Sequence, residues 1–223
     1  MTKNFLLLII LSLALFFSFP LKAEKKSEKT KKETVPIIIT SEQAIWDNKK
    51  EITTLTEKVV VIRGADHFLA NKMEIWGNFN DLKKIIGYED IKILNQEEQV
   101  NLTGSYFEYD KEKDYALVTG NPVLISEKDK LEITSQKMEK YFKDYLFIAI
   151  GKVKVKKEDT RATGEKLHFF EKEKKAILTG SPQLFQEKNT FSGEKIVFYL
   201  NEDKVEVYGK VKSTVYLEEK TKK

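Results

Sequence analysis

The sequence has no cysteine and only two histidines among its 223 residues. Without cysteine the chain cannot form a disulfide, a thiol nucleophile or a thiolate metal site. The two histidines, His67 and His168, lie far apart, and neither has a partner at the spacing of metal ligands. We therefore predict no metal site and no cofactor.

Catalytic motifs are lacking as well. The chain has no glycine-rich phosphate loop, no nucleophile elbow and no grouping of serine, histidine and aspartate. Acidic pairs such as Glu89-Asp90 and Glu97-Glu98 lie between apolar segments, where solvated turns are expected rather than a glycosidase pair. These absences predict that the protein is not an enzyme.

An excess of one charge is also missing. Lysine and arginine number 39 against 35 aspartates and glutamates, a net charge of +4, and the two signs are interspersed. Such a surface is typical of a solvated domain and does not indicate nucleic acid as a partner. With 41% hydrophobic residues the chain is able to form the core of one domain.

The two ends of the chain differ from its middle. Residues 1–23 contain Lys3 before an apolar run from Phe5 to Phe19, and they end on the small residue Ala23, which predicts a cleaved signal peptide and export. A retained membrane anchor is the alternative, but the run is shorter than the roughly 20 residues that span a bilayer. Residues 24–36 are predicted to be a charged flexible linker, 37–217 the folded domain and 218–223 a charged tail.

A repeat of about thirty residues runs through the folded part. Five of the six units have a glycine near the middle, at successive spacings of 33, 31, 29 and 29 residues, and the first unit has Glu57 at this place. The glycines are Gly87, Gly120, Gly151, Gly180 and Gly209. A second signature precedes each of these positions: a small residue, two mostly polar residues, an apolar residue, any residue and usually an aromatic. Its copies begin at Ser41, Ala70, Gly104, Ser135, Gly164 and Gly193.

Each unit is interpreted as two strands joined by a polar turn. Alternation is clearest in the last unit, where Val205 and Val207 share one face and Glu206 and Lys210 point the other way. The same alternation in the other units predicts a sheet with one apolar face and one solvent-exposed polar face. The residues predicted to line the apolar face are Val59, Val61, Phe107, Leu124, Phe147, Ala149, Val153, Val155, Phe169, Leu178, Leu184, Phe198, Val205, Val207 and Val211.

A glycine inside a strand usually marks a bend, a bulge or a close approach of two backbones. Its recurrence predicts one bend in each unit, so that the sheet folds over on itself. We expect an all-β protein with almost no helix, in which short antiparallel strands form two facing sheets or a flattened tube, in the manner of a jelly roll or a coiled β-stack. The second unit needs one or two extra residues after Gly87, which predicts a bulge before Ile91.

Aromatic residues recur on the first strand of the units, and two interpretations are open. They fill a closed core between two sheets, or they line a groove that is open to an elongated apolar ligand. The residues in question are Trp46, Trp76, Tyr109, Phe169 and Phe198.

The combination of signal peptide, small-x-x-apolar-x-aromatic signature, charged turn and apolar-x-Gly-x-Val ending resembles the OstA-like (LptA) family of periplasmic lipopolysaccharide-transport proteins. The last element is seen in the segments 148–155 and 207–211. The likeness covers about residues 37–217. Departures from the pattern are Glu57 in place of glycine, Pro122 and Pro182 after two glycines, and Lys140 in place of an aromatic.

The resemblance implies a single β-jellyroll of stacked short antiparallel strands. It also implies the function of a periplasmic carrier or bridge, whose β-groove shields the lipid A acyl chains of lipopolysaccharide on the way from the inner to the outer membrane. It also implies partners: like domains of the inner- and outer-membrane transport complexes, and further copies of the chain joined head to tail. The alternatives are a membrane-anchored, LptC-like component of the same pathway and a structural β-solenoid that binds no ligand.

Overall fold

The computed structural model describes residues 35–78, 81–202 and 204–216, and these residues form strands and turns without a helix. The strands make one antiparallel sheet of 18 strands. The prediction of an all-β jellyroll of short stacked strands is therefore confirmed. The predicted signal peptide, most of the linker and the charged tail lie outside the described residues.

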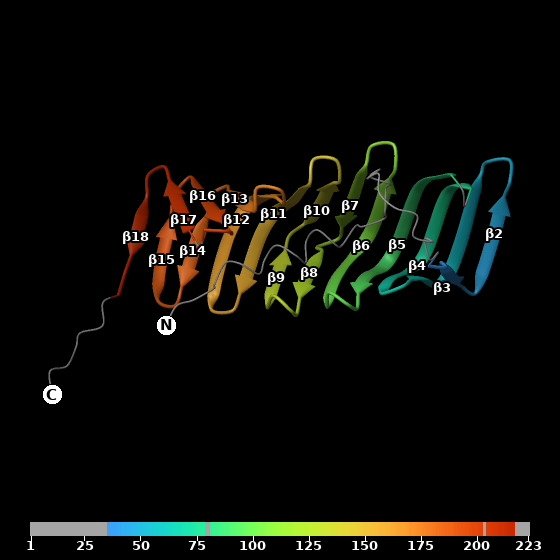
Figure 1. Ribbon diagram of the computed structural model, residues 1–223, viewed down its shortest axis with the longest axis horizontal. Coiled ribbons are helices and arrows are strands. Elements are labelled where there is room, and N and C mark those ends of the chain that lie inside the picture. Colours follow the sequence, from blue (N-terminus) through green and yellow to red (C-terminus); the bar gives the residue numbers. More distant parts are fainter. Residues whose placement is uncertain (1–34, 79–80, 203, 217–223) are drawn as a thin grey trace, which may run out of the picture.

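The sheet is folded along its length into two layers, because the chain turns a corner in the middle of each repeat. Six strands pass through both layers: β3 (Ile52–Arg63), β4 (Asp66–Asn78), β5 (Asp81–Asn95), β6 (Val100–Asp110), β11 (Leu146–Lys157) and β12 (Thr160–Phe170). The first layer also contains β2 (Gln43–Asp47), β7 (Tyr115–Thr119), β10 (Lys137–Tyr141), β13 (Lys175–Thr179), β16 (Lys195–Tyr199) and β17 (Lys204–Tyr208). The second layer also contains β1 (Ile38–Thr40), β8 (Val123–Ser126), β9 (Leu131–Thr134), β14 (Gln183–Gln186), β15 (Asn189–Ser192) and β18 (Lys212–Thr214). Figure 1 shows the resulting elongated stack, which follows the chain from the blue end at β2 to the red end at β18.

Two kinds of corner alternate along the stack. In the first kind, two consecutive residues adopt the left-handed conformation, with φ between 42° and 85°. These left-handed corners are Glu57-Lys58, Glu89-Asp90, Gly120-Asn121, Gly151-Lys152, Gly180-Ser181 and Gly209-Lys210. Glycine adopts this conformation without the steric cost of a Cβ atom, which explains why it recurs there.

The second kind of corner, the small-residue corner, begins with the small residue of the signature. Gly104 and Gly164 belong to this kind, and a Cβ atom on either would lie 2.9 Å from the carbonyl oxygen of Thr119 or Thr179 in the next strand. The residue after the small one packs over a neighbouring left-handed corner. Gln136, which follows Ser135, is an example: a Cβ atom on Gly151 would overlap with its Oε1 atom. Small side chains are therefore required where the two backbones approach each other.

Gly87 does not form the corner of its unit, which corrects the alignment of the five glycines. The corner lies two residues later, at Glu89-Asp90, where the pairing of β5 with β6 shifts between Tyr88 and Ile91. The bulge expected before Ile91 is therefore present. Gly87 remains extended, and a Cβ atom on it would lie 2.8 Å from the Phe68 ring.

The core lies between the two layers and extends along most of the stack. Phe107 and Phe147 of the first layer belong to the same buried cluster as Leu124 and Ile133 of the second. A smaller cluster around Leu55, at the N-terminal end, is joined to it by residues that pack against both. Burial of these apolar faces is the main contribution that holds the layers together.

The aromatic residues of the signature do not all share this core. Tyr109 and Phe169 are buried in it and Phe198 packs against it. Trp76 points outward, because the buried Ile75 takes the inward place of that strand and a shift of one residue changes the face. Trp46 has inward parity, opposite the buried Thr53, but its side chain is 62% exposed at the end of the sheet.

Candidate functional site

The interior between the layers contains nearly all residues predicted to line the apolar face. Nine are buried: Val59, Phe107, Leu124, Phe147, Ala149, Val153, Phe169, Leu178 and Leu184. Four are partly buried and pack against the core clusters: Val61, Val155, Phe198 and Val207. In this structure their own side chains fill the interior, so a ligand would have to displace them or separate the layers.

The remaining two predicted residues, Val205 and Val211, are exposed near the C-terminal end of the sheet, with exposed fractions of 38% and 56%. Val205 is on β17, which pairs with β16 on one side only, and its inward-facing side chain therefore has no neighbouring strand to cover it. Trp46 is exposed for the same reason at the other end of the stack, because β2 pairs only with β3 in the first layer. The apolar interior thus reaches the surface at both ends of the stack.

A buried ion pair lies at the edge of the apolar interior. Lys140 on β10 forms an ion pair with Glu171, which follows β12, and their side chains are only 4% and 5% exposed. Burial lowers the pKa of Lys140 from its ordinary value, and the nearby Glu171 carboxylate opposes this shift. The sequence shows that Lys140 departs from the aromatic signature, but it does not show that Glu171 is the residue that pairs with it.

The outer face of the first layer has a different chemistry. Glutamates lie there between tyrosine hydroxyls and lysines: Glu108 accepts a hydrogen bond from Tyr106 at 2.6 Å and pairs with Lys84 at 2.7 Å. Burial acts to raise the pKa of Glu108, but the hydrogen bonds from Lys84 and Tyr106 outweigh it and lower the pKa. This face is polar and internally paired, in contrast to the interior.

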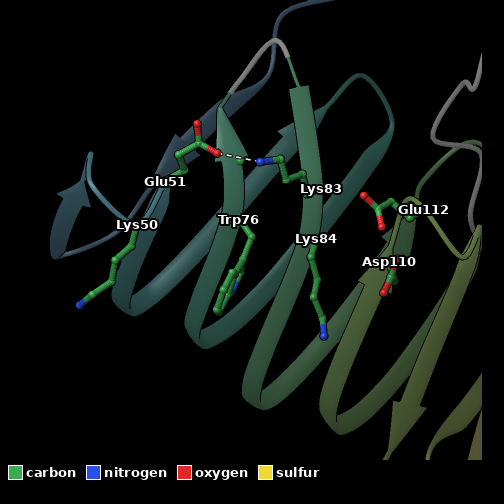
Figure 2. Close-up of a pocket in the computed structure, with 8 residues that line it drawn as sticks. Lys50, Glu51, Trp76, Lys83, Lys84, Asp110 and Glu112 are labelled. Carbon is green, nitrogen blue, oxygen red and sulfur yellow. Dashed lines mark hydrogen bonds and ion pairs between the residues drawn. The ribbon is translucent and has the colours of Figure 1, made fainter.

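Two surface cavities lie near the N-terminal end of the first layer, with volumes of about 270 and 260 Å³. Figure 2 shows the cavity of about 270 Å³, where the Trp76 ring lies between Lys50 and Lys84. Trp76 and Lys84 both belong to the outer face, so this cavity is separate from the apolar interior.

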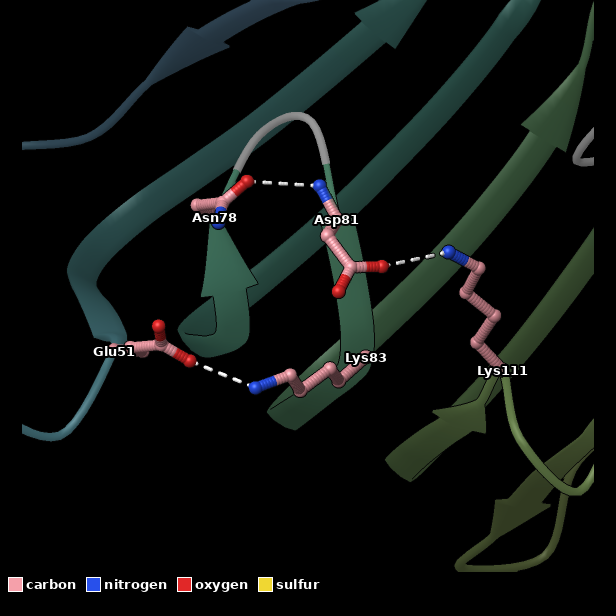
Figure 3. A network of polar contacts seen from close by, with 5 residues as sticks. All are labelled: Glu51, Asn78, Asp81, Lys83 and Lys111. Atoms are coloured by element: carbon pink, nitrogen blue, oxygen red, sulfur yellow. Dashed lines mark hydrogen bonds and ion pairs between the residues drawn. The ribbon is translucent and has the colours of Figure 1, made fainter.

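The hairpin turns beside this cavity are joined by a polar network, shown in Figure 3. Lys83 pairs with Glu51 at 2.7 Å, and Lys111 pairs with Asp81 at 3.1 Å. The backbone N–H of Asp81 donates to Oδ1 of Asn78 at 2.8 Å. These charges neutralise one another, which leaves the cavity without a dominant charge for binding an ion.

The described residues contain no cluster of histidine, cysteine, aspartate and glutamate suited to a metal ion. His67 and His168 lie on different strands, β4 and β12, and burial lowers the pKa of His168. No helix within the described part of the chain has the length and apolar character needed to cross a membrane.

The structure defines a folded β-stack of the jellyroll class, with a continuous apolar interior and an unpaired strand edge at each end. The sequence profile of the family described as "LptA/(LptD N-terminal domain) LPS transport protein" matches this chain twice, at residues 38–144 and 101–204. The two matches overlap and together cover most of the chain. The chain therefore belongs to this family of lipopolysaccharide-transport proteins, as its repeat predicts.

One similar solved structure is that of LptH from Pseudomonas aeruginosa, described as "the LptA homologous periplasmic component of the conserved lipopolysaccharide transport device" of that organism. It is 17% identical to this chain, covers 54% of it and is itself covered to 97%, with a TM-score of 0.49. A search of curated proteins found no match.

Proposed function

We propose that this protein is a periplasmic carrier that shields the acyl chains of lipopolysaccharide between its two layers. The observation that carries the proposal is the continuous apolar interior, which is exposed at Trp46 on one end and at Val205 on the other. Acyl chains need cover from water in an aqueous compartment, and a track open at both ends allows them to pass from one domain to the next. The periplasmic location rests on the predicted signal peptide and on the family.

The ends also support head-to-tail assembly through strand pairing. A row of unpaired backbone groups on an edge strand is a template for adding another strand. Within the sheet, left-handed corners always alternate with small-residue corners. The C-terminal end finishes on the left-handed corner Gly209-Lys210 and the N-terminal end starts on the small-residue corner Ser41-Glu42, so only a head-to-tail contact continues the alternation.

The internal pairing defines the register of this contact. In each unit the residue two places after the small residue lies opposite the residue that precedes a left-handed corner in the neighbouring strand. Lys137, two places after Ser135, is an example: it lies opposite Thr119 and Ile150, which precede the left-handed corners at Gly120 and Gly151. By the same rule Gln43 of one copy lies opposite Tyr208 of the next. Trp46 then lies opposite Val205 and covers it, and Asp47 lies opposite Lys204, which places opposite charges together.

The test of the carrier function is photocrosslinking to lipopolysaccharide. A photoreactive residue at Val155, which faces inward on β11, is expected to label the lipid. The matched control is Lys154, the next residue on the same strand, which faces outward and is expected to stay unlabelled. Equal labelling at the two positions would contradict binding between the layers.

The test of the assembly is disulfide crosslinking. Since the chain has no native cysteine, only the introduced thiols can form a disulfide. Ala44→Cys and Val207→Cys in one chain are expected to give a ladder of crosslinked copies, because opposite Cβ atoms lie about 5 Å apart. Ile45→Cys with Val207→Cys places the thiols on opposite faces and is the control. Lipid labelling without a ladder would leave the carrier function and exclude self-assembly in this register.

A structural stack without a ligand is the second candidate, and the burial of the central lining residues favours it. In that case the interior stays closed and neither Val155 nor Lys154 acquires lipid. The photocrosslinking experiment therefore separates the two candidates directly.

A further inference from the structure

The ion pair between Lys140 and Glu171 lies at a boundary inside the molecule. On β10, Met138 faces the interior near the corner, and Lys140 faces it two residues nearer to the hairpin turn. Lys140 lies opposite Ala116 and Phe147, and its side chain passes β11 to reach Glu171 at the start of the turn after β12. The pair is thus where the apolar interior meets the turns that face water.

A charge at this place has a cost that an apolar side chain would not have. Two charges removed from water lose more solvation than their attraction returns, unless the geometry is excellent. The corresponding places in other units are taken by Tyr109, Phe169 and Phe198, which pack in the core or against it. The position therefore tolerates an apolar side chain, and the lysine places a charge beside the apolar residues Ala116 and Phe147.

The boundary is also where the head of an amphiphile would lie. If acyl chains occupy the apolar region between Met138 and the corners, the group that joins them to the polar head comes level with Lys140. Lysine offers three N–H donors, and charge-assisted hydrogen bonds to an anionic oxygen are strong in a site shielded from water. Glu171 is held at this level by its own backbone, since its N–H donates to the Tyr145 carbonyl at 2.9 Å.

We propose that Lys140 binds the anionic headgroup of an amphiphile and that Glu171 occupies this place when no ligand is bound. A phosphate on the ligand takes the position of the Glu171 carboxylate beside Lys140, so that the lysine stays compensated with and without ligand. This inference rests on the proposed carrier function and adds a preference for anionic lipids to it.

The test measures binding of two surfactants with the same chain to the purified full-length protein, by calorimetry below their micelle concentrations. Dodecyl phosphate is expected to bind about tenfold more tightly than dodecyl maltoside, as one charge-assisted hydrogen bond in a shielded site would give. The double variant Lys140→Met, Glu171→Leu removes both charges and is expected to bind the two surfactants equally. Glu171→Gln removes the competing carboxylate and is expected to strengthen binding of dodecyl phosphate alone.

The control variant is Lys137→Met, which breaks the outer-face pair between Lys137 and Glu139 on the same strand and should leave both affinities unchanged. Circular dichroism establishes that each variant is folded. A double variant that keeps the preference for dodecyl phosphate would overturn the proposal, as would displacement of dodecyl phosphate by inorganic phosphate alone. Equal binding of the two surfactants to the unchanged protein would overturn it and leave the carrier function intact, whereas binding of neither would contradict both.

Discussion

The Val118 side chain occupies the space that a side chain on Gly104 would need. A Cβ atom on Gly104 would lie 2.5 Å from Cγ1 of Val118 and 2.9 Å from the Thr119 carbonyl oxygen. Val118 is fully buried and restricted in its side-chain rotamer, and the backbone oxygen moves only with its strand. This contact explains why the signature requires a small residue, and it makes the corner sensitive to a single methyl group.

Gly104→Ala is therefore expected to lower the free energy of unfolding by about 1–3 kcal/mol, the usual cost of overpacking a core. Chemical denaturation followed by circular dichroism measures it. Gly64→Ala is the control, because a Cβ atom there meets only Val35 at 3.7 Å and the cost comes from its positive φ alone. Equal stability of Gly104→Ala and the unchanged protein would contradict the close approach of the two strands.

Glu57 is the opposite case, since it adopts a φ of 61° at a corner where other units have glycine. The left-handed conformation costs a residue with a Cβ atom about 1–2 kcal/mol of folding free energy. Glycine avoids this cost, but part of the gain is lost because glycine loses more conformational entropy on folding. Glu57→Gly is expected to raise the free energy of unfolding by up to about 1 kcal/mol. Glu42→Gly, at the neighbouring corner without positive φ, should not stabilise the protein, and a loss of stability in Glu57→Gly would refute the strain.

The buried pair predicts a pattern of stabilities that is independent of any ligand. Lys140→Met alone leaves the Glu171 charge buried without its partner, and we expect a loss of about 3–5 kcal/mol. The double variant Lys140→Met, Glu171→Leu is expected to be as stable as the unchanged protein or up to about 4 kcal/mol more stable. Thermal and denaturant unfolding of the single and double variants test this, and a double variant as unstable as the single one would show that the pair itself stabilises the fold.

Glu206 on β17 is expected to titrate far below an ordinary glutamate. The hydrogen bond from Lys204 lowers its pKa to about 2, helped by hydrogen bonds from Tyr208 and Tyr199. Because this folded-state pKa lies below the unfolded value of 4.5, the contribution of Glu206 to stability is present above pH 4.5 and is lost as the pH falls through 2. The carboxyl carbon shift in an NMR titration measures the pKa, and Tyr208→Phe should raise it. A midpoint near 4.5 in the unchanged protein would disprove these hydrogen bonds.

The strand pattern could be predicted where the alternation is regular. Val205 and Val207 share a face in both the sequence and the structure, because β17 continues without a bulge from 204 to 208. The family follows from the same repeat. The lining of a lipid site stays a prediction, since burial between the layers fits a filled core as well as a ligand track.

The sequence is less informative where a corner lacks glycine. Glu89 and Asp90 turn the second unit, and Gly87 two residues earlier carries the visible signal. Acidic residues in the left-handed conformation cannot be recognised from residue type alone, because aspartate and glutamate are more frequent in ordinary turns. The pair of Lys140 and Glu171 joins residues 31 apart across a whole strand, so its existence depends on a register that only the folded sheet defines.

The alternation of corners also limits how such a protein can change in length. Removing one strand would bring two corners of the same kind together, whereas removing residues 120–150 would join Thr119 to Gly151 and leave the alternation and both ends intact. Strands lie about 4.8 Å apart, so every permitted deletion or duplication changes the length of the stack by roughly 10 Å. The distance that one copy covers is thus adjustable only in discrete steps, while the surfaces through which it meets its neighbours stay the same.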